Sequence, residues 1–292
     1  MVVEMECVLD AQAQLGEGPV WDVDRQILYW VDIDRGEVHL FDPARFEDRA
    51  ISLGMKVGSV VPARSGELVA ATAEGFGVLD PRKGRLMRIA DPESDNPDSR
   101  FNDGKADPVG RFWAGTTSNT GRKGAGALYC LDTDASVDRK LEGISISNGL
   151  AWSLDEDVMY FIDSPTRQVV AFDYDADSGD ITNERVVVEV PAEEGMPDGM
   201  AIDAEGKLWV AMWDGGQVCR FDPSSGRMLE AISVPVSRVT SCAFGGPGLE
   251  TLYITTARTG LRDRDLKQQP LAGGIFRCRP AVPGVEAYYF EG

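Results

Sequence analysis

Three oxygen-bearing residues of this 292-residue chain, Glu17, Asn148 and Asp198, are each followed directly by glycine. One such dipeptide on its own usually marks a turn. Here each dipeptide opens an apolar, strand-like segment at the same point of a recurring sequence unit. Two carboxylates and an amide brought to one point repel each other unless a cation neutralises them. The pattern therefore predicts a divalent metal site with Glu17, Asn148 and Asp198 as ligands.

The remaining residue types decide which metal chemistry is available. The chain has one histidine, His39, which lies in a strand-like run and for which we expect no catalytic role. A Ser-His-Asp catalytic triad would have to use His39, and a metal site with several histidines is excluded. An all-oxygen site favours Ca²⁺, Mg²⁺ or Mn²⁺, with Zn²⁺ and Fe²⁺ left open. Three protein ligands leave coordination positions for water and substrate, as a catalytic metal requires.

The strands that position these residues belong to a sequence unit that recurs along the chain. Six similar units open at Glu17, Gly58, Asp103, Asn148, Asp198 and Thr240, with starts 41, 45, 45, 50 and 42 residues apart. Several short strands in a unit of this length are typical of a β-propeller, whereas a β-sandwich does not need its strands to recur in units. We predict an all-β, six-bladed β-propeller formed by one domain over residues 1–292. The first strand of each blade lines the central channel, so the opening residues should meet at one channel mouth.

Two further expectations follow from a closed ring. The strand-like segment VVEMECVLD (2–10) should pair with the last blade near EAYYFEG (286–292). Large apolar residues occupy similar places in the units and should be buried between blades. They are Trp21, Trp152, Leu208, Trp209 and Tyr253.

Composition excludes several classes of partner and location. The net charge is −19, from 29 basic and 48 acidic residues, which argues against nucleic acid or an anionic membrane as partner. No stretch approaches the roughly 20 apolar residues of a membrane span, and the first residues lack a targeting signal. The five cysteines are scattered and form no CxxC pair, so we expect no disulfide framework and a cytoplasmic location.

At these residues the chain resembles the senescence marker protein-30/gluconolactonase family, which includes regucalcin. The resemblance covers almost the whole length. It rests on LGEGPVWD (15–22), SRFNDGKADPVGRFWAGT (99–116), ISNGLAWSLDEDVMYFIDS (146–164), PDGMAIDAEGKLWVA (197–211), TSCAFGG (240–246) and QQPLAGGIFR (268–277). It implies a six-bladed propeller with one divalent metal in the channel and hydrolysis of sugar lactones.

The resemblance also implies roles for individual residues. Glu17, Asn148 and Asp198 match the metal ligands, and Arg100 and Asn102 match residues that contact substrate. Several relatives carry an acidic, sugar-contacting residue in the loop after FWAGT, but the loop here, TSNTGRKGAGALY (117–129), has none, which leaves the sugar undetermined. Gly199 is expected to keep a side chain away from the metal.

The expected reaction is metal-assisted hydrolysis of a sugar lactone to the open-chain aldonic acid. Asp198 is the candidate general base, and the attacking water is either metal-bound or held by Asp198. Arg100 and Asn102 would orient the sugar. Two alternatives remain: an esterase or phosphotriesterase that uses the same metal, and a propeller that binds metal without catalysis.

Overall fold

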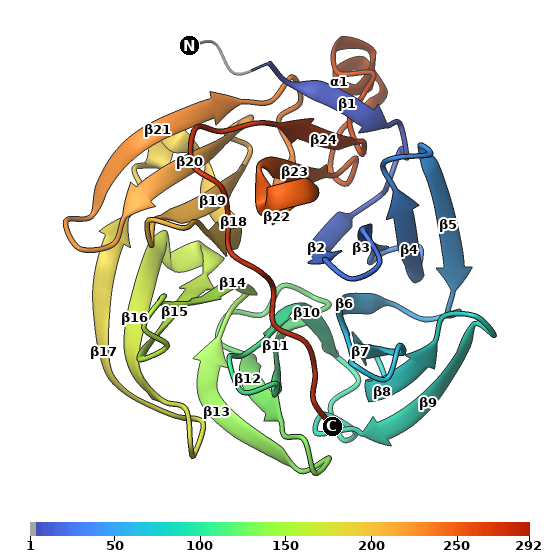
Figure 1. The fold of residues 1–292 in the computed structure, drawn as a ribbon, viewed down its shortest axis with the longest axis vertical. Helices are drawn as coiled ribbons and strands as arrows, with labels where there is room; N and C mark the ends of the chain where they lie inside the picture. Colours follow the sequence, from blue (N-terminus) through green and yellow to red (C-terminus); the bar gives the residue numbers. More distant parts are fainter. Residues whose placement is uncertain (1–3) are drawn as a thin grey trace.

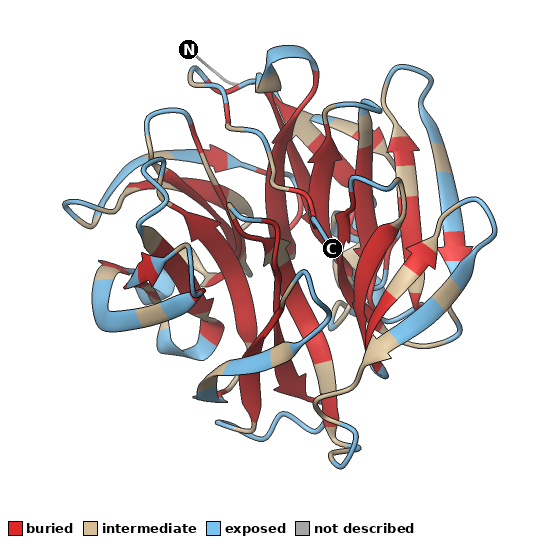
Figure 2. Ribbon diagram, turned by 60° about the horizontal axis from the view of Figure 1, so that its bottom comes forward, coloured by how far each residue is buried: buried red, intermediate tan, exposed pale blue. Residues whose placement is uncertain are grey.

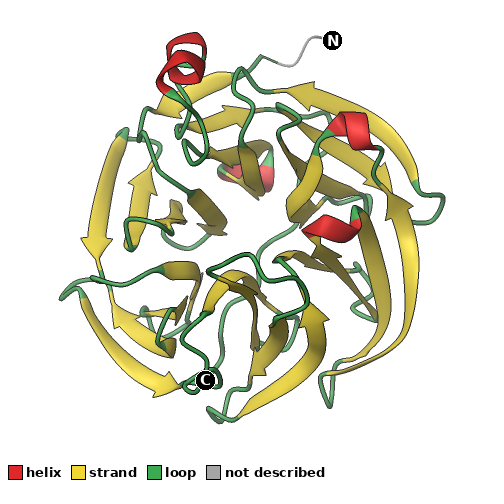
Figure 3. Cartoon of the chain, turned by 180° about the vertical axis from the view of Figure 1, so that it is seen from behind, coloured by secondary structure: helices red, strands yellow, loops and turns green. Residues whose placement is uncertain are grey.

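The structure is a computed structural model that describes residues 4–292, and these residues form six four-stranded antiparallel sheets around an axis (Figure 1). The predicted all-β, six-bladed β-propeller is confirmed. Within the described residues, helix is confined to short segments, drawn red in Figure 3. They are α1 (Asp263–Gln268), η1 (Ser164–Thr166), η2 (Ala192–Glu194) and η3 (Pro247–Leu249). No helix of this part of the chain is long and apolar enough to cross a membrane.

Each blade places one strand next to the axis and one at the periphery. The inner strands are β2 (Gly16–Asp22), β6 (Val57–Pro62), β10 (Ser99–Ala106), β14 (Ser147–Trp152), β18 (Met196–Ile202) and β22 (Val239–Gly245). The middle strands are β3 (Ile27–Asp32), β4 (Glu37–Asp42), β7 (Leu68–Thr72), β8 (Gly75–Asp80), β11 (Phe112–Ser118), β12 (Gly126–Leu131), β15 (Val158–Asp163), β16 (Gln168–Asp175), β19 (Leu208–Trp213), β20 (Gln217–Asp222), β23 (Thr251–Thr256) and β24 (Ile275–Cys278). The outer strands are β1 (Glu6–Leu9), β5 (Glu47–Ser52), β9 (Arg85–Ala90), β13 (Val137–Ile144), β17 (Asp180–Glu189) and β21 (Arg227–Ser233).

Burial falls from the axis outward, as Figure 2 shows. Strands β2, β6, β14 and β22 are buried at every residue, whereas outer strands such as β5 and β21 are exposed at most positions. An inner strand has a neighbouring blade on both faces, which explains its continuous run of small and apolar residues. His39 lies in β4, stacked on Trp30 and hydrogen-bonded through Nδ1 to Asp48 at 2.6 Å. All five cysteines are free.

The N-terminal strand closes the ring by pairing with the last blade, as expected, but it pairs with a different segment from the one expected. Strand β1 is the fourth strand of the last blade and pairs with β24, with Cys7 opposite Phe276. The predicted pairing with 286–292 is wrong, and residues 2 and 3 of the predicted strand lie outside the described residues. Pro280 and Pro283 interrupt the chain after β24, so that Ile275–Cys278 is the last segment able to offer a regular strand edge.

Large side chains fill the interfaces between blades. Trp21 of the first blade stacks on Tyr253 of the last, with ring centroids 5.6 Å apart. Trp152 meets Trp113 of the preceding blade, and Trp209 meets Phe244 of the following one, at centroid distances of 6.1 and 5.9 Å. The residues predicted to lie between blades are all buried. Each aromatic pair is worth about 1 kcal/mol beyond the area it removes from water.

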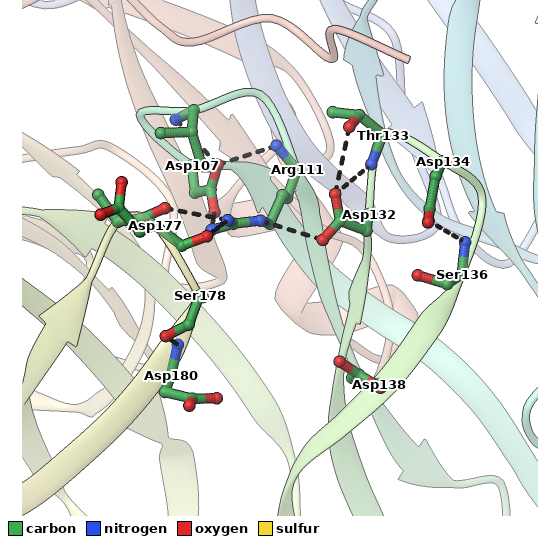
Figure 4. Close-up of polar contacts among 12 residues, drawn as sticks. Asp107, Arg111, Asp132, Thr133, Asp134, Ser136, Asp138, Asp177, Ser178 and Asp180 are labelled. Carbon is green, nitrogen blue, oxygen red and sulfur yellow. Dashed lines mark hydrogen bonds and ion pairs between the residues drawn. The ribbon is translucent and has the colours of Figure 1, made fainter.

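A polar contact also joins blades. Arg111 of the third blade is buried and donates hydrogen bonds to the carbonyl oxygens of Ala176 and Asp177 in the β16–β17 turn, at 2.9 and 2.7 Å (Figure 4). Its guanidinium also lies 3.4 Å from Asp107 and 3.3 Å from Asp132. Arg111 therefore fixes the third blade to the fourth.

Candidate functional site

The predicted site residues occupy an irregularity that recurs in all six blades. Every inner strand shifts register against its neighbour near its start, which marks a β-bulge or a similar break in the ladder. The shifts lie at Glu17/Val20, Val57/Ser59, Phe101/Gly104, Ser147/Leu150, Pro197/Met200 and Val239/Ser241. Each interval begins with or contains the residue that opens the sequence unit. Because a bulge re-aims the side chain it carries, this irregularity explains why the repeat can present a polar residue at the same level in several blades.

The three predicted ligands lie at this level and are almost completely buried. Glu17, Asn148 and Asp198 are 4%, 4% and 6% exposed. The Oε2 atom of Glu17 accepts a hydrogen bond from its own neighbour, the backbone N–H of Gly18, at 3.0 Å. The Oδ1 atom of Asp198 has no hydrogen-bond partner among the described residues. A buried carboxylate oxygen without a partner is costly, so this atom is the clearest sign that the site is built for a ligand.

A relay of hydrogen bonds fixes the amide groups of the site. Arg100 donates to Oδ1 of Asn102 at 2.7 Å, and Nδ2 of Asn102 donates to Oδ1 of Asn148 at 2.9 Å. Nδ2 of Asn148 donates to the hydroxyl of Ser164 at 2.7 Å, and that hydroxyl donates to the carbonyl oxygen of Pro197 at 2.6 Å. The relay crosses three blades and holds Asn148 beside Asp198. It leaves Oδ1 of Asn148 with capacity for a further partner.

The carboxylates destabilise one another electrostatically. Burial and the neighbouring Asp103 raise the pKa of Glu17 to about 8, against the lowering effects of the Gly18 N–H and Arg100. Burial raises the pKa of Asp198 well above its usual range, and Glu17 and Asp103 add to that shift. The structure thus brings Glu17 and Asp198 together, as predicted, and a third carboxylate lies close to both. Their charged forms need a compensating cation.

This donor set suits a hard divalent cation. The carboxylates of Glu17 and Asp198, the latter with its unpartnered Oδ1 atom, and the amide oxygen of Asn148 provide only oxygen ligands. No cluster of three or more His, Cys, Asp or Glu side chains with metal-binding geometry occurs in residues 4–292. The amide of Asn148 is therefore the group that would complete a three-ligand set with Glu17 and Asp198.

Two opening positions of the repeat do not contribute a free ligand. Gly58 has no side chain, and an added Cβ would collide with the backbone of Phe101 and Asn102. The Thr240 hydroxyl donates to the carbonyl oxygen of Gly16 at 2.6 Å, which ties the last blade to the first. The site is consequently assembled by the first, third, fourth and fifth blades.

Gly199 has a different role from the one expected. A Cβ at this position would collide with Ser241 of the neighbouring inner strand. The glycine therefore allows the inner strands of the fifth and sixth blades to approach each other closely. What it prevents is a clash between blades.

Sequence reasoning assigned no site role to three residues that the fold places here. Asp103 is 5% exposed and belongs to the carboxylate group; its position as the opening residue of the third unit was the available signal. Ser164 anchors Asn148 from the first position of η1, directly after β15, and no pattern in the sequence indicates this. Lys105 lies two residues after Asp103 on the same strand, and its Nζ atom reaches across to the carbonyl oxygen of Met200 at 2.6 Å.

Known proteins match both the sequence and the fold. The family model described as "SMP-30/Gluconolactonase/LRE-like region" matches residues 15–258. The chain is 41% identical to the putative sugar lactone lactonase YvrE of Bacillus subtilis and 40% identical to human regucalcin, with 99% of each chain covered in both comparisons. It superimposes on the crystal structure of the calcium-binding protein regucalcin from Agrobacterium tumefaciens with a TM-score of 0.95 and 28% identity, covering 100% of this chain and 99% of that one. The chain belongs to the SMP-30/gluconolactonase/LRE-like family.

Proposed function

We propose that this protein hydrolyses a sugar lactone to the open-chain aldonic acid, with a divalent cation held by Glu17, Asn148 and Asp198. The observation that carries the proposal is the buried Oδ1 atom of Asp198, which has no partner and lies at the level of two other oxygen ligands. Relatives named as a sugar lactone lactonase and as a calcium-binding protein support this choice of reaction and cation. A bound cation would supply Lewis-acid stabilisation of the negative charge that develops on the lactone carbonyl.

The protein's own side chains would bind and orient the sugar. The guanidinium of Arg100 uses one nitrogen, Nη1, for the carbonyl oxygen of Phe101 and the amide oxygen of Asn102. The remaining N–H donors are available for the lactone carbonyl or a ring hydroxyl. Both N–H donors of Asn102 are engaged, to the carbonyl oxygen of Ser147 and to Asn148, so its Oδ1 is the atom left to accept from a sugar hydroxyl. Arg100 would thus donate hydrogen bonds to the substrate, and Asn102 would accept one from it.

Asp198 would act as the general base. Its carboxylate would hold the cation through one oxygen and would accept with the other a proton from the water that attacks the lactone carbonyl carbon. The Ser164 hydroxyl donates to the carbonyl oxygen of Pro197, the residue before Asp198, and so fixes the backbone from which the base projects. The ring C–O bond would then break, the ring oxygen would take the proton back from Asp198 to become a hydroxyl, and the aldonate would leave.

The test combines activity with metal content. Asp198→Ala should lose about 10²- to 10⁴-fold in lactonase turnover, together with bound metal measured by mass spectrometry. Asn148→Ala should lower metal affinity and activity together. Asp155→Ala, an exposed aspartate in the β14–β15 loop, is the matched control and should change neither. Full lactonase activity in Asp198→Ala would refute the mechanism.

A substrate panel separates the proposal from its rivals. Aldonolactones should be hydrolysed faster than aryl esters and phosphotriesters, each assayed with Ca²⁺, Mg²⁺, Mn²⁺, Zn²⁺ and Fe²⁺. Preference for an aryl ester or a phosphotriester would assign the site to that reaction instead. Metal binding without turnover of any substrate would favour a binding protein.

We propose a cytoplasmic location for the protein, and its five free cysteines support this proposal.

A further inference from the structure

A cavity lies near the ends of the inner strands that are opposite the carboxylates. Its volume is about 210 Å³, and it is lined by Trp21, Trp152 and Phe244 near the ends of their inner strands. Strand β2 carries Glu17 near its start and Trp21 near its end, so Trp21 lies roughly 13 Å along the strand from Glu17. Apart from one lysine and one glutamate, the side chains that line the cavity are mostly apolar or aromatic.

Lys105 forms the inner wall of this cavity. Its side chain crosses the channel from β10 in the third blade to the carbonyl oxygen of Met200 in the fifth. An ammonium group has three N–H donors, and this carbonyl is its one hydrogen-bond partner among residues 4–292. Asp103 lies on the same strand but makes no ion pair with Lys105 in the described part of the chain. Burial lowers the pKa of Lys105, and the nearby carboxylate of Asp103 counteracts that effect. Two of the three donors of the ammonium group are left without a partner among the described residues, beside an apolar space.

The C-terminal segment closes the outer side. Residues 285–288 line the cavity and belong to the segment that runs across the ring in Figure 1. The segment is fixed at both ends by backbone hydrogen bonds, from Ala204 N–H to the carbonyl oxygen of Pro283 and from Phe290 N–H to that of Pro62, both 2.9 Å. Glu286 is the other charged residue of the lining. It is exposed on this C-terminal segment, called the C-terminal strap below, where solvent screens its charge.

We propose that this cavity binds a small apolar carboxylate, with the carboxylate on the Lys105 ammonium and the hydrocarbon part between Trp21, Trp152 and Phe244. A cavity of about 150 Å³ lined by apolar side chains holds benzene, so about 210 Å³ accommodates a six-membered ring with a carboxylate attached. The anion supplies acceptors for the two free donors of Lys105, in a setting where charge-assisted hydrogen bonds are strong. The site is separate from the proposed lactone site and does not depend on that activity.

Calorimetric titration of the full-length protein tests the proposal, with benzoate as probe and benzamide as its uncharged counterpart. Benzoate should bind about tenfold more tightly than benzamide, because a hydrogen bond to a charged group is stronger than one to a neutral group. In Lys105→Met this preference should disappear. Lys123→Met, an exposed lysine in the β11–β12 loop, is the matched control and should retain it.

A second variant tests where benzoate binds while Lys105 stays in place. Ala287→Phe places a ring in the cavity from the C-terminal strap and should abolish benzoate binding while lactone hydrolysis and the melting temperature stay unchanged. Benzoate binding that survives in Ala287→Phe would place the anion elsewhere and overturn the proposal. Equal affinities for benzoate and benzamide in the wild-type protein would overturn it as well.

Discussion

Glu17→Gln offers the most direct test of how the carboxylates of the site interact. Glu17 has an ordinary carboxyl pKa of 4.5 and a folded-state pKa of about 8. Between these values the native protein holds a proton that the unfolded chain releases, so stability without metal falls as the pH rises. From pH 5.5 to pH 8 this one group lowers the free energy of unfolding by about 3 kcal/mol, because each pKa unit is worth about 1.4 kcal/mol.

Glutamine keeps the acceptor for the Gly18 N–H but cannot ionise. Glu17→Gln should therefore remove about 3 kcal/mol of the pH-dependent loss, which corresponds to roughly 6 °C in melting temperature for a chain of this size. The measurement is urea or thermal unfolding in the presence of a chelator at pH 5.5 and pH 8. Glu47→Gln, an exposed residue of β5, serves as control and should leave the pH dependence of the wild type unchanged.

Metal addition provides the second half of the test. A cation that binds only the native state stabilises it in proportion to the logarithm of its concentration. The wild-type protein at pH 8 should gain stability on addition of Ca²⁺ or Mn²⁺, and Glu17→Gln should gain much less. A variant that retained the pH dependence of the wild type in chelator would refute the claim that Glu17 is desolvated among other carboxylates. A variant with the full metal effect would remove Glu17 from the ligand set.

Three further outcomes are expected. Ser164→Ala should weaken metal affinity about tenfold in calorimetry with little change in melting temperature, because it frees the Asn148 amide; an unchanged affinity would show that the relay does not position the ligand. Arg111→Met should lower the free energy of unfolding by about 2 kcal/mol in urea and leave metal affinity intact, because it removes the contact between the third and fourth blades. Deletion of residues 1–9 should lower the melting temperature in calorimetry, since β24 would lose its partner strand; an unaltered melting temperature would mean that β1 does not hold the ring closed.

The sequence repeat predicted both the level of the site in the propeller and the packing between blades. The opening residue of each unit falls within the register shift of an inner strand, so the phase of the repeat located the level of the site. Aromatic residues in equivalent places predicted the packing between blades for the same reason: a repeated unit meets the same environment six times. The ring closure was harder to predict, because an edge strand can pair with any free edge and residues 286–292 have strand-like character too.

The sequence by itself determined the fold and the chemical type of the site. A period of 41 to 50 residues requires repeated sheets, and a chain with one histidine and scattered cysteines leaves only oxygen atoms to meet a cation. Tertiary structure alone decided how those atoms are held. Ser164 orients Asn148, Asp103 changes the pKa of Glu17, and Lys105 joins the third blade to the fifth. These effects depend on contacts between blades far apart in sequence, and no local pattern records which side chains will meet across a ring.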